Sequence, residues 1–392
     1  MRTSDDRILT THVGSLPRST ELTELLLKRD AGEAVAEREL KALVQAGTLD
    51  AVRKQIAAGI DIVNDGEQPR AGFSTQITAR MSGFGAGSAS RRRQATDYTR
   101  FPGFADYWRW MFRGIEARSH SQPQTVGELH YVDLAPVRSE CDQLNDALKA
   151  GGTPDVEGFF TSPSPGIIST TMENKHYESH EKYVFALARE LRNEYQAIIE
   201  AGLILQIDAP DLALERSILF QDGTDEDFIG VMEVHIAALN EALRGIPTDR
   251  VRLHVCWGAW GRPHADDIAL EAILPTLLTA QVGALSIPFA NPRHQHEYQV
   301  LRTIRLPDSM VLIPGVIDST TNFVEHPQVV ANRIIEAVDV VGDRSRVIAG
   351  TDCGFGTFAG FEQVAKDVVF AKLASCRRGA DSASRSLWGK AR

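Results

Sequence analysis

Short apolar runs alternate with amphipathic stretches along almost the whole chain of 392 residues. Nine of the apolar runs have the length and composition of strands, and they begin near residues 8, 60, 124, 157, 203, 251, 283, 310 and 347. Helical periodicity is expected between them, at 19–30, 36–59, 104–117, 178–202, 225–244, 266–280, 326–340 and 361–375. This alternation predicts a parallel sheet covered by helices.

A single closed (β/α)8 TIM barrel suits the chain length better than an open sheet. Because such a barrel has eight strands, one of the nine runs must belong to an insertion, and we assign 124–131 to it. We expect the barrel to occupy residues 1–376 and a polar tail to follow at 377–392. Polar residues come directly after several strands: Asp65, Glu67, Asp208, His254, Cys256, Asp318, Asp352 and Cys353. They predict an active site at the carboxyl end of the barrel strands.

Composition excludes several classes of function. A formal net charge of -10 argues against nucleic-acid binding, because a phosphate backbone would be repelled. No apolar run approaches the roughly 20 residues that span a bilayer, and the polar segment Met1–Arg7 lacks the apolar core of a signal peptide. Four cysteines in so long a chain do not form a disulfide framework, so a reducing cytoplasm is expected. The basic run Arg91–Arg93 reads as a solvated loop, with a basic substrate patch as the alternative.

Two short segments carry candidate metal chemistry. In a strand, alternate residues share a face, so His254 and Cys256 are expected to point the same way. Cys353 follows another apolar run, and three such ligands with one open position are the pattern of a catalytic zinc site. The alternative is that His-x-Cys arises by chance and the thiols are small buried hydrophobes. Cys141 and Cys376 lie in helical surroundings, and we interpret them as structural or incidental.

Six motifs occur in order along the chain, and together they resemble the catalytic barrel of cobalamin-independent methionine synthase. They are Thr10–Pro17, Asn64–Glu67, Gln206–Pro210, His254–Cys256, Gly315–Asp318 and Asp352–Gly354. The resemblance covers about residues 8 to 370. It includes single-barrel relatives such as core methionine synthases and epoxyalkane:coenzyme M transferase, which are zinc enzymes that alkylate a thiol.

The resemblance implies roles for individual residues. His254, Cys256 and Cys353 would bind Zn²⁺. Ser15, Glu67 and Asp208 would hold the amino-acid part of a homocysteine-like thiol, with His12 as a further substrate-binding candidate. Asp318 and Thr320 occupy the region of the family's acid and are the candidate catalytic residues. His12, His294 and His296 lie near strand ends and are extra candidates for catalysis. The alternatives are a salt bridge between Glu67 and Arg70, a helix cap at Asp208, and structural roles for the three histidines.

Three departures from the family pattern bear on the reaction. Pro288 stands where the synthase has a glutamate zinc ligand, so three ligands remain. Thr320 stands where the synthase has an acid histidine, and a threonine hydroxyl is no acid near pH 7. The segment 162–168 lacks the tryptophan on which the synthase stacks its folate.

The predicted function is therefore a zinc-dependent alkyltransferase acting on a thiol, with methyl transfer to homocysteine or a similar thiol placed first. Thiol addition to an epoxide or another electrophile is the second hypothesis, and a metal-binding barrel without catalysis is the third. The expected partners are a small-molecule thiol and a methyl or alkyl donor. The sequence leaves the oligomeric state open, a homo-oligomer included.

Overall fold

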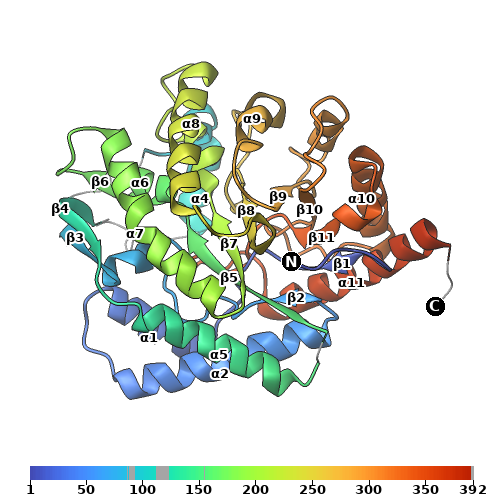
Figure 1. Ribbon diagram of the computed structural model, residues 1–392, viewed down its shortest axis with the longest axis horizontal. Coiled ribbons are helices and arrows are strands. Elements are labelled where there is room, and N and C mark those ends of the chain that lie inside the picture. Colours follow the sequence, from blue (N-terminus) through green and yellow to red (C-terminus); the bar gives the residue numbers. More distant parts are fainter. Residues whose placement is uncertain (86, 88–92, 112–122, 154, 390–392) are drawn as a thin grey trace.

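A parallel sheet stands at the centre of the computed structural model, which describes residues 1–85, 87, 93–111, 123–153 and 155–389 (Figure 1). Its strands are β1 (Leu9–Thr10), β2 (Ile62–Val63), β5 (Glu157–Pro163), β7 (Ile204–Asp208), β8 (Val251–His254), β9 (Ala284–Pro288), β10 (Val311–Ile317) and β11 (Ile348–Thr351). Their spatial order is β1-β11-β10-β9-β8-β7-β5-β2, which follows the chain around a ring. The predicted single TIM barrel is confirmed, and the eight strands are those expected from the apolar runs.

Asp61 joins the two ends of this sheet. Its backbone N–H donates to the Thr10 carbonyl at 3.1 Å, and its carboxylate accepts from the Thr10 N–H at 2.8 Å. Thr11 adds a hydroxyl donation to the Ile62 carbonyl at 2.9 Å. Arg7 and Arg377 face the same carboxylate and compensate its charge. These contacts bring β1 and β2 together and nearly close the barrel.

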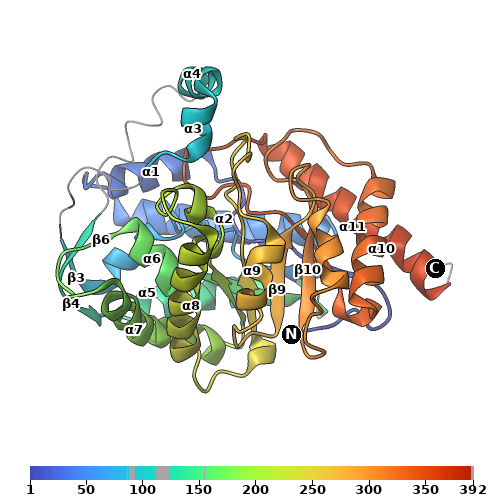
Figure 2. The same cartoon turned by 90° about the horizontal axis from the view of Figure 1, so that it is seen from above.

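Helices surround the strands in both views (Figures 1 and 2). They are α1 (Thr20–Asp30), α2 (Glu37–Ala57), α5 (Ala135–Gly151), α6 (Pro165–Thr171), α7 (His180–Glu200), α8 (Asp225–Ala242), α9 (Leu270–Leu277), α10 (Pro327–Val341) and α11 (Lys366–Trp388). None of the helices in the described ranges combines the length and the apolar content needed to cross a membrane. Cys141 lies on α5 and Cys376 on α11, both buried, as their surroundings predicted.

The predicted insertion at 124–131 is confirmed as a strand outside the barrel sheet. It is β4 (Gln124–Tyr131), which pairs with β3 (Met81–Gly85) and β6 (Glu173–Asn174) in a separate three-stranded sheet at one side of the molecule (Figure 1). Two short helices, α3 (Thr96–Arg100) and α4 (Pro102–Met111), stand away from the barrel in Figure 2. The helix expected at 104–117 corresponds to α4, and its second half lies outside the described residues. Arg91 and Arg92 also lie outside them, whereas the exposed Arg93 pairs with Asp222.

The chain does not end in a separate polar tail after residue 376, because α11 continues to Trp388. Gly379, Ala380 and Ala383 are buried on this extension. A Cβ atom on Gly379 would lie 2.4 Å from the Val330 side chain, so the absence of a side chain allows α11 to approach α10 closely. Small residues of this kind carry little hydrophobic signal, which is why the sequence pattern placed the end of the helix too early.

The barrel interior is built in layers that follow the alternation of strand residues. An apolar layer at one end consists of Leu9, Ile62, Phe159, Ile204, Ala284, Val311, Ile313 and Ile348. Above it lies Arg252, whose guanidinium is 3.5 Å from the centre of the Phe159 ring. Arg252 donates to Gln206 Oε1 at 2.7 Å and to Thr11 Oγ1 at 3.0 Å. Burial lowers the pKa of Arg252 to about 9. The next inward residues along β7 and β8 are Asp208 and His254, so the polar layer supports the predicted site from below.

Asp61→Asn is expected to lower the free energy of unfolding by about 1.5–3 kcal/mol, the usual worth of hydrogen bonds to a charged group. Burial opposes ionisation of this carboxyl, but the Arg7 guanidinium prevails and holds its pKa below the ordinary value. The contribution is therefore present above the ordinary pKa of aspartate and is lost as the pH falls through the folded-state pKa. Urea unfolding at several pH values measures this contribution to the free energy of unfolding.

Asp50→Asn, which removes an exposed ion pair with Lys54, is the control and should change the free energy of unfolding by less than about 1 kcal/mol. Equal losses in the two variants would contradict the closure role of Asp61.

Candidate metal centre

His254, Cys256 and Cys353 converge at the carboxyl end of the barrel strands. One ligand atom from each lies within 4.8 Å of the other two, and the two sulfur atoms are 3.9 Å apart. His254 ends β8, Cys256 follows two residues later, and Cys353 is the second residue after the end of β11. The expected shared face of His254 and Cys256 is thus present, with Cys353 brought to it from a distant part of the chain.

The two thiols share protons unequally. Donation from the Cys353 thiol lowers the pKa of Cys256 well below its ordinary value, and the nearby His254 ring acts in the same direction. The Cys256 sulfur, together with burial, raises the pKa of Cys353 well above its ordinary value. Burial would lower the pKa of His254, but the Cys256 sulfur outweighs it and raises that pKa. The cluster therefore favours one thiolate beside a positively charged partner.

The residues fit a bound divalent cation. Neither ring nitrogen of the buried His254 has a hydrogen-bond partner among the described residues. An unpartnered polar atom in the interior is costly, and a cation would compensate the imidazole and both sulfurs together. Two thiolates and one imidazole are ligands that suit zinc.

The loop that carries Cys353 is tied to neighbouring strand ends. Asp352 accepts hydrogen bonds from the backbone N–H groups of Phe289, Ala290 and Asn291 at 2.7–2.9 Å. Burial raises the pKa of Asp352 to about 7, and the nearby Asp318 carboxylate adds to the rise. These bonds fix the position of Cys353 relative to the loop after β9.

Ser15 lies on the other side of the same loop. Its carbonyl accepts from the Phe355 N–H at 2.9 Å, and its hydroxyl accepts from the Gly356 N–H at 3.2 Å. A Cβ atom on Gly354 would lie 2.0 Å from the Ser15 hydroxyl oxygen, so only glycine permits this approach. Ser15 is therefore packed directly against the segment that carries Cys353.

Glu67 and Asp208 present two buried carboxylates near the cysteine cluster. Asp208 is the register partner of His254, and its Oδ1 accepts from Gln206 at 2.7 Å. Glu67 Oε1 accepts from the Thr161 hydroxyl at 2.9 Å, whereas its buried Oε2 has no partner among the described residues. Burial raises the pKa of Asp208 to about 7; the adjacent His254 opposes the rise and the Glu67 carboxylate adds to it.

Neither structural alternative for these carboxylates is found. Within the described residues, Arg70 donates to Thr161 and lies 3.7 Å from Glu140, with no ion pair to Glu67. The short helical turn that follows Asp208 begins at Pro210, and no side chain caps it. Glu67 has a positive φ of 55°, a strained conformation for a non-glycine residue. Its backbone is held there while one carboxylate oxygen remains unpaired.

His12 is turned away from the cluster. Its Nε2 lies 2.6 Å from Gln55 Oε1 on α2, and its ring packs edge-on against Phe159. Burial lowers the pKa of His12 to about 3, so the ring stays neutral. Its neighbour Thr11 contacts Arg252 inside the barrel, and alternation therefore directs His12 outward. These contacts connect the end of β1 to α2.

Asp318, Thr320 and Pro288 line a small cavity together with Cys256 and Cys353. Asp318 Oδ1 accepts from the Thr320 hydroxyl at 2.8 Å and from the Thr320 N–H at 2.9 Å. The cavity volume is about 20 Å³, which is room for about one water molecule. A ligand larger than a water molecule does not fit this cavity as it stands.

A second polar cluster at this cavity was not expected from the sequence as a unit. His264 and His294 line the cavity, and both contact Asp267. The sequence marks His294 as a histidine near a strand end, whereas nothing in the sequence pattern singles out His264 or Asp267. Their only sequence signal is their position in the loops after β8 and β9. His296, the other histidine noted there, is exposed.

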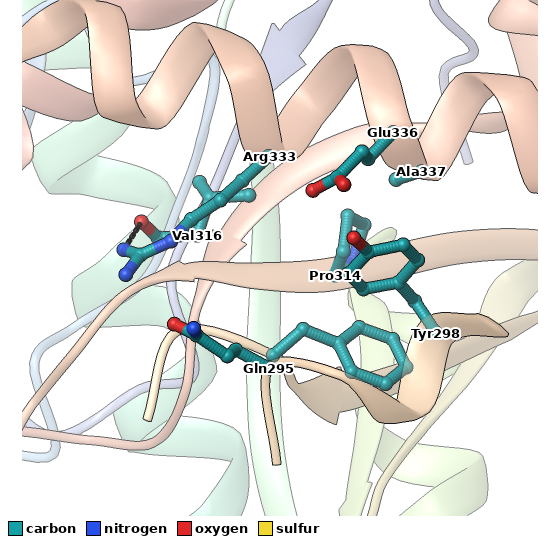
Figure 3. Close-up of a pocket in the computed structure, with 8 residues that line it drawn as sticks. Gln295, Tyr298, Pro314, Val316, Arg333, Glu336 and Ala337 are labelled. Carbon is teal, nitrogen blue, oxygen red and sulfur yellow. Dashed lines mark hydrogen bonds between the residues drawn. The ribbon is translucent and has the colours of Figure 1, made fainter. Parts of the chain in front are cut away.

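The larger hollow in Figure 3 lies elsewhere. Its volume is about 200 Å³, and Tyr298, Pro314, Val316, Arg333 and Glu336 are among its lining residues. Pro314 and Val316 alternate with the inward-facing Ile313, so this hollow lies between the outer face of β10 and α10. Arg333 donates to the Val316 carbonyl at 2.9 Å across it. It contains none of the residues predicted to react.

Comparison with known proteins identifies the family. The model of the cobalamin-independent synthase catalytic domain matches residues 8–97 and 122–375, and the chain belongs to this family. A methionine synthase of Sulfurisphaera tokodaii is 23% identical over 382 residues, covering 97% of this chain and 94% of that protein. A B12-independent methionine synthase from Shewanella sp. W3-18-1, solved with selenomethionine, has a TM-score of 0.73 at 21% identity, with 98% of this chain and 100% of that chain covered. A putative B12-independent methionine synthase from Listeria monocytogenes has a TM-score of 0.64 at 18% identity, with coverages of 98% and 100%. The resemblance seen in the six motifs is thereby confirmed.

Replacing Cys256 or Cys353 with alanine is expected to abolish tight zinc binding at this cluster, because only two of the three protein ligands remain. The purified protein should carry about one tightly held zinc per chain at the cluster, measured by elemental analysis after dialysis. Cys141→Ala and Cys376→Ala are matched controls, since both thiols are buried in helices and should not affect the metal. Equal metal content in all four variants would contradict the assignment.

Proposed function

We propose that this member of the cobalamin-independent synthase family is a zinc-dependent methyltransferase that alkylates the thiol of homocysteine or a closely related amino acid. One observation carries the proposal: a His254/Cys256/Cys353 ligand set lies beside two buried carboxylates, Glu67 and Asp208. The relatives named methionine synthase support the same reaction.

His254, Cys256 and Cys353 would hold the zinc. With two thiolates and a neutral imidazole, the zinc site would be formally neutral and would keep one position open. When bound, zinc would lower the pKa of a substrate thiol, so that the nucleophilic thiolate is present at neutral pH. The loop contacts of Asp352 and Ser15 keep Cys353 in place, as described above.

Glu67 and Asp208 would bind the ammonium group of the thiol substrate. Two nearby carboxylates in the interior repel each other, and the pKa of Asp208 is raised by burial and by this repulsion. An ammonium placed between them would offset the repulsion and supply the missing hydrogen bond to Glu67 Oε2. This contact would orient the thiol toward the ligand set and hold it for attack on the methyl carbon.

The residues expected near the methyl or alkyl donor support a second candidate reaction. The Thr320 hydroxyl donates to Asp318 and is no acid near pH 7, and segment 162–168 offers no tryptophan for a folate ring. These departures favour an electrophile other than a folate, and thiol addition to an epoxide is the second candidate. A barrel that binds metal without catalysis is the third, because Pro288 stands where the synthase has a glutamate.

Asp208→Asn is expected to weaken homocysteine binding to the zinc-loaded protein by about 1.5–3 kcal/mol, since a charge-assisted hydrogen bond is lost. Titration calorimetry measures the affinity, and zinc content should remain that of the unsubstituted chain. A simple thiol without an amino group, such as 2-mercaptoethanol, is the matched control ligand, and its affinity should not change.

The same titrations separate the alternatives. Tighter binding of a sulfonate thiol than of homocysteine would favour the epoxide reaction over methyl transfer. Loss of zinc or of the folded state in Asp208→Asn would show that the carboxylate is structural, and the substrate model would then be wrong.

A further inference from the structure

His264, Asp267 and His294 form a second group of metal-ligating side chains near the cysteine cluster. One ligand atom from each lies within 4.8 Å of the other two. His264 and Asp267 lie in the loop after β8, and His294 lies in the loop after β9. Both rings line the same cavity as Cys256 and Cys353. The group is therefore adjacent to the predicted zinc site but shares no ligand with it.

The outward-facing atoms of this group are already fixed by hydrogen bonds. His264 Nε2 lies 3.2 Å from the Trp260 carbonyl, and His294 Nδ1 lies 2.7 Å from Glu297 Oε2. Asp267 Oδ1 accepts from Arg262. Histidine ligands of metals usually donate their other N–H to a carboxylate or a backbone carbonyl, which sets the tautomer and the ring orientation. The three inward-facing atoms, His264 Nδ1, Asp267 Oδ2 and His294 Nε2, are left facing one another.

Each imidazole lies between two acceptors. His264 Nδ1 is 2.6 Å and His294 Nε2 is 2.9 Å from the same Asp267 oxygen, so four ring nitrogens in total face a carbonyl or carboxylate oxygen. A neutral imidazole has one N–H and would place its bare nitrogen against an oxygen. Either both rings carry a second proton, or a cation takes the place of those two protons.

The charges of the group also require either two additional ring protons or one divalent cation. Asp97, Asp267 and Glu297 contribute three carboxylates, whereas Arg262 is the one guanidinium that pairs with Asp97 and Asp267 in the part of the chain that the structure describes. With neutral imidazoles, two negative charges would be left uncompensated among side chains that are at most 7% exposed. Burial makes such an excess costly. Two imidazolium protons would neutralise it, and one divalent cation would neutralise it equally.

We propose that His264 Nδ1, Asp267 Oδ2 and His294 Nε2 bind a divalent transition-metal cation, in a second site distinct from the cysteine cluster. Two imidazoles and one carboxylate suit zinc or ferrous iron. The cation binds in competition with protons on the ring nitrogens, so affinity rises with pH. Zinc ligands lie about 2.0–2.1 Å from the metal. To bind a cation between them, each of the three ligand atoms would therefore have to move by less than about 1 Å.

Two further observations agree with this site. His264 has a positive φ of 55°, which it shares only with Glu67 among the non-glycine residues of the described ranges, and strained residues gather at functional sites. Trp257, the neighbour of Cys256, stacks on the His294 ring at 4.1 Å and fixes its plane.

Zinc stoichiometry tests the proposal without any assay of activity. The full chain is stripped with a chelator, loaded with zinc near pH 8 and desalted, and its zinc is measured by elemental analysis. We expect about two zinc ions per chain, and about one in the double variant Cys256→Ala/Cys353→Ala. Adding His294→Gln to the double variant should remove the remaining zinc. His296→Gln, an exposed histidine of the same loop, is the matched control and should leave it bound.

Cobalt loading of the unsubstituted chain gives a second reading that does not depend on how the variants fold. The site with thiolates should produce an intense near-ultraviolet sulfur-to-cobalt band, and a further equivalent should bind without adding to that band, releasing about two protons. Saturation at one equivalent that accounts for the whole sulfur band would overturn the proposal. So would a folded double cysteine variant that binds no zinc, and in that case the cysteine site and the proposed methyl transfer would still stand.

Discussion

Two sulfur atoms and an imidazole held together in the interior are the constraint on which the rest of the site depends. The Sγ atoms of Cys256 and Cys353 lie 3.9 Å apart, although the residues come from strands that are not neighbours in the sheet. A closed barrel brings such strand ends to one place, and the alternation of side chains directs His254 inward. In the layer below, Arg252 and Gln206 are joined by a hydrogen bond and lie beneath His254 and Asp208.

The barrel also explains how the same few strands could supply residues for binding both a substrate and a metal. Asp208 and His254 are register partners on β7 and β8, so a group bound by the carboxylate is necessarily near the metal ligands. Glu67 reaches the same region from the end of β2. Gly14 makes this possible, because a Cβ atom there would lie 2.8 Å from the Glu67 carboxylate oxygen. The loops after β8 and β9 then add a second, histidine-rich layer around the cavity, so charged groups surround it from several directions.

Much of this arrangement follows from the periodicity of the sequence, and the parts that do not have physical reasons. Eight apolar runs gave the barrel strands, and a period of two placed His254 and Cys256 on one face. The same period, counted from the inward-facing Leu9, would have turned His12 outward, where the structure has it. His264 and Asp267 lie in a loop, and His264 itself has a positive φ. Neither the path of a loop nor a positive φ produces a periodic pattern in the sequence, so this cluster could not be predicted from it. The end of α11 was missed because its contacts use glycine and alanine, whose burial depends on close helix packing rather than on hydrophobicity.

X-ray absorption at the zinc edge, on protein loaded with a single equivalent of zinc, tests the central claim most directly. With the cation at the cysteine cluster, the spectrum should show about two sulfur atoms and at least one imidazole nitrogen around zinc. Homocysteine should raise the sulfur count to about three if the position left open by Pro288 accepts the substrate thiol. A zinc environment of nitrogen and oxygen alone, unchanged by homocysteine, would contradict the account.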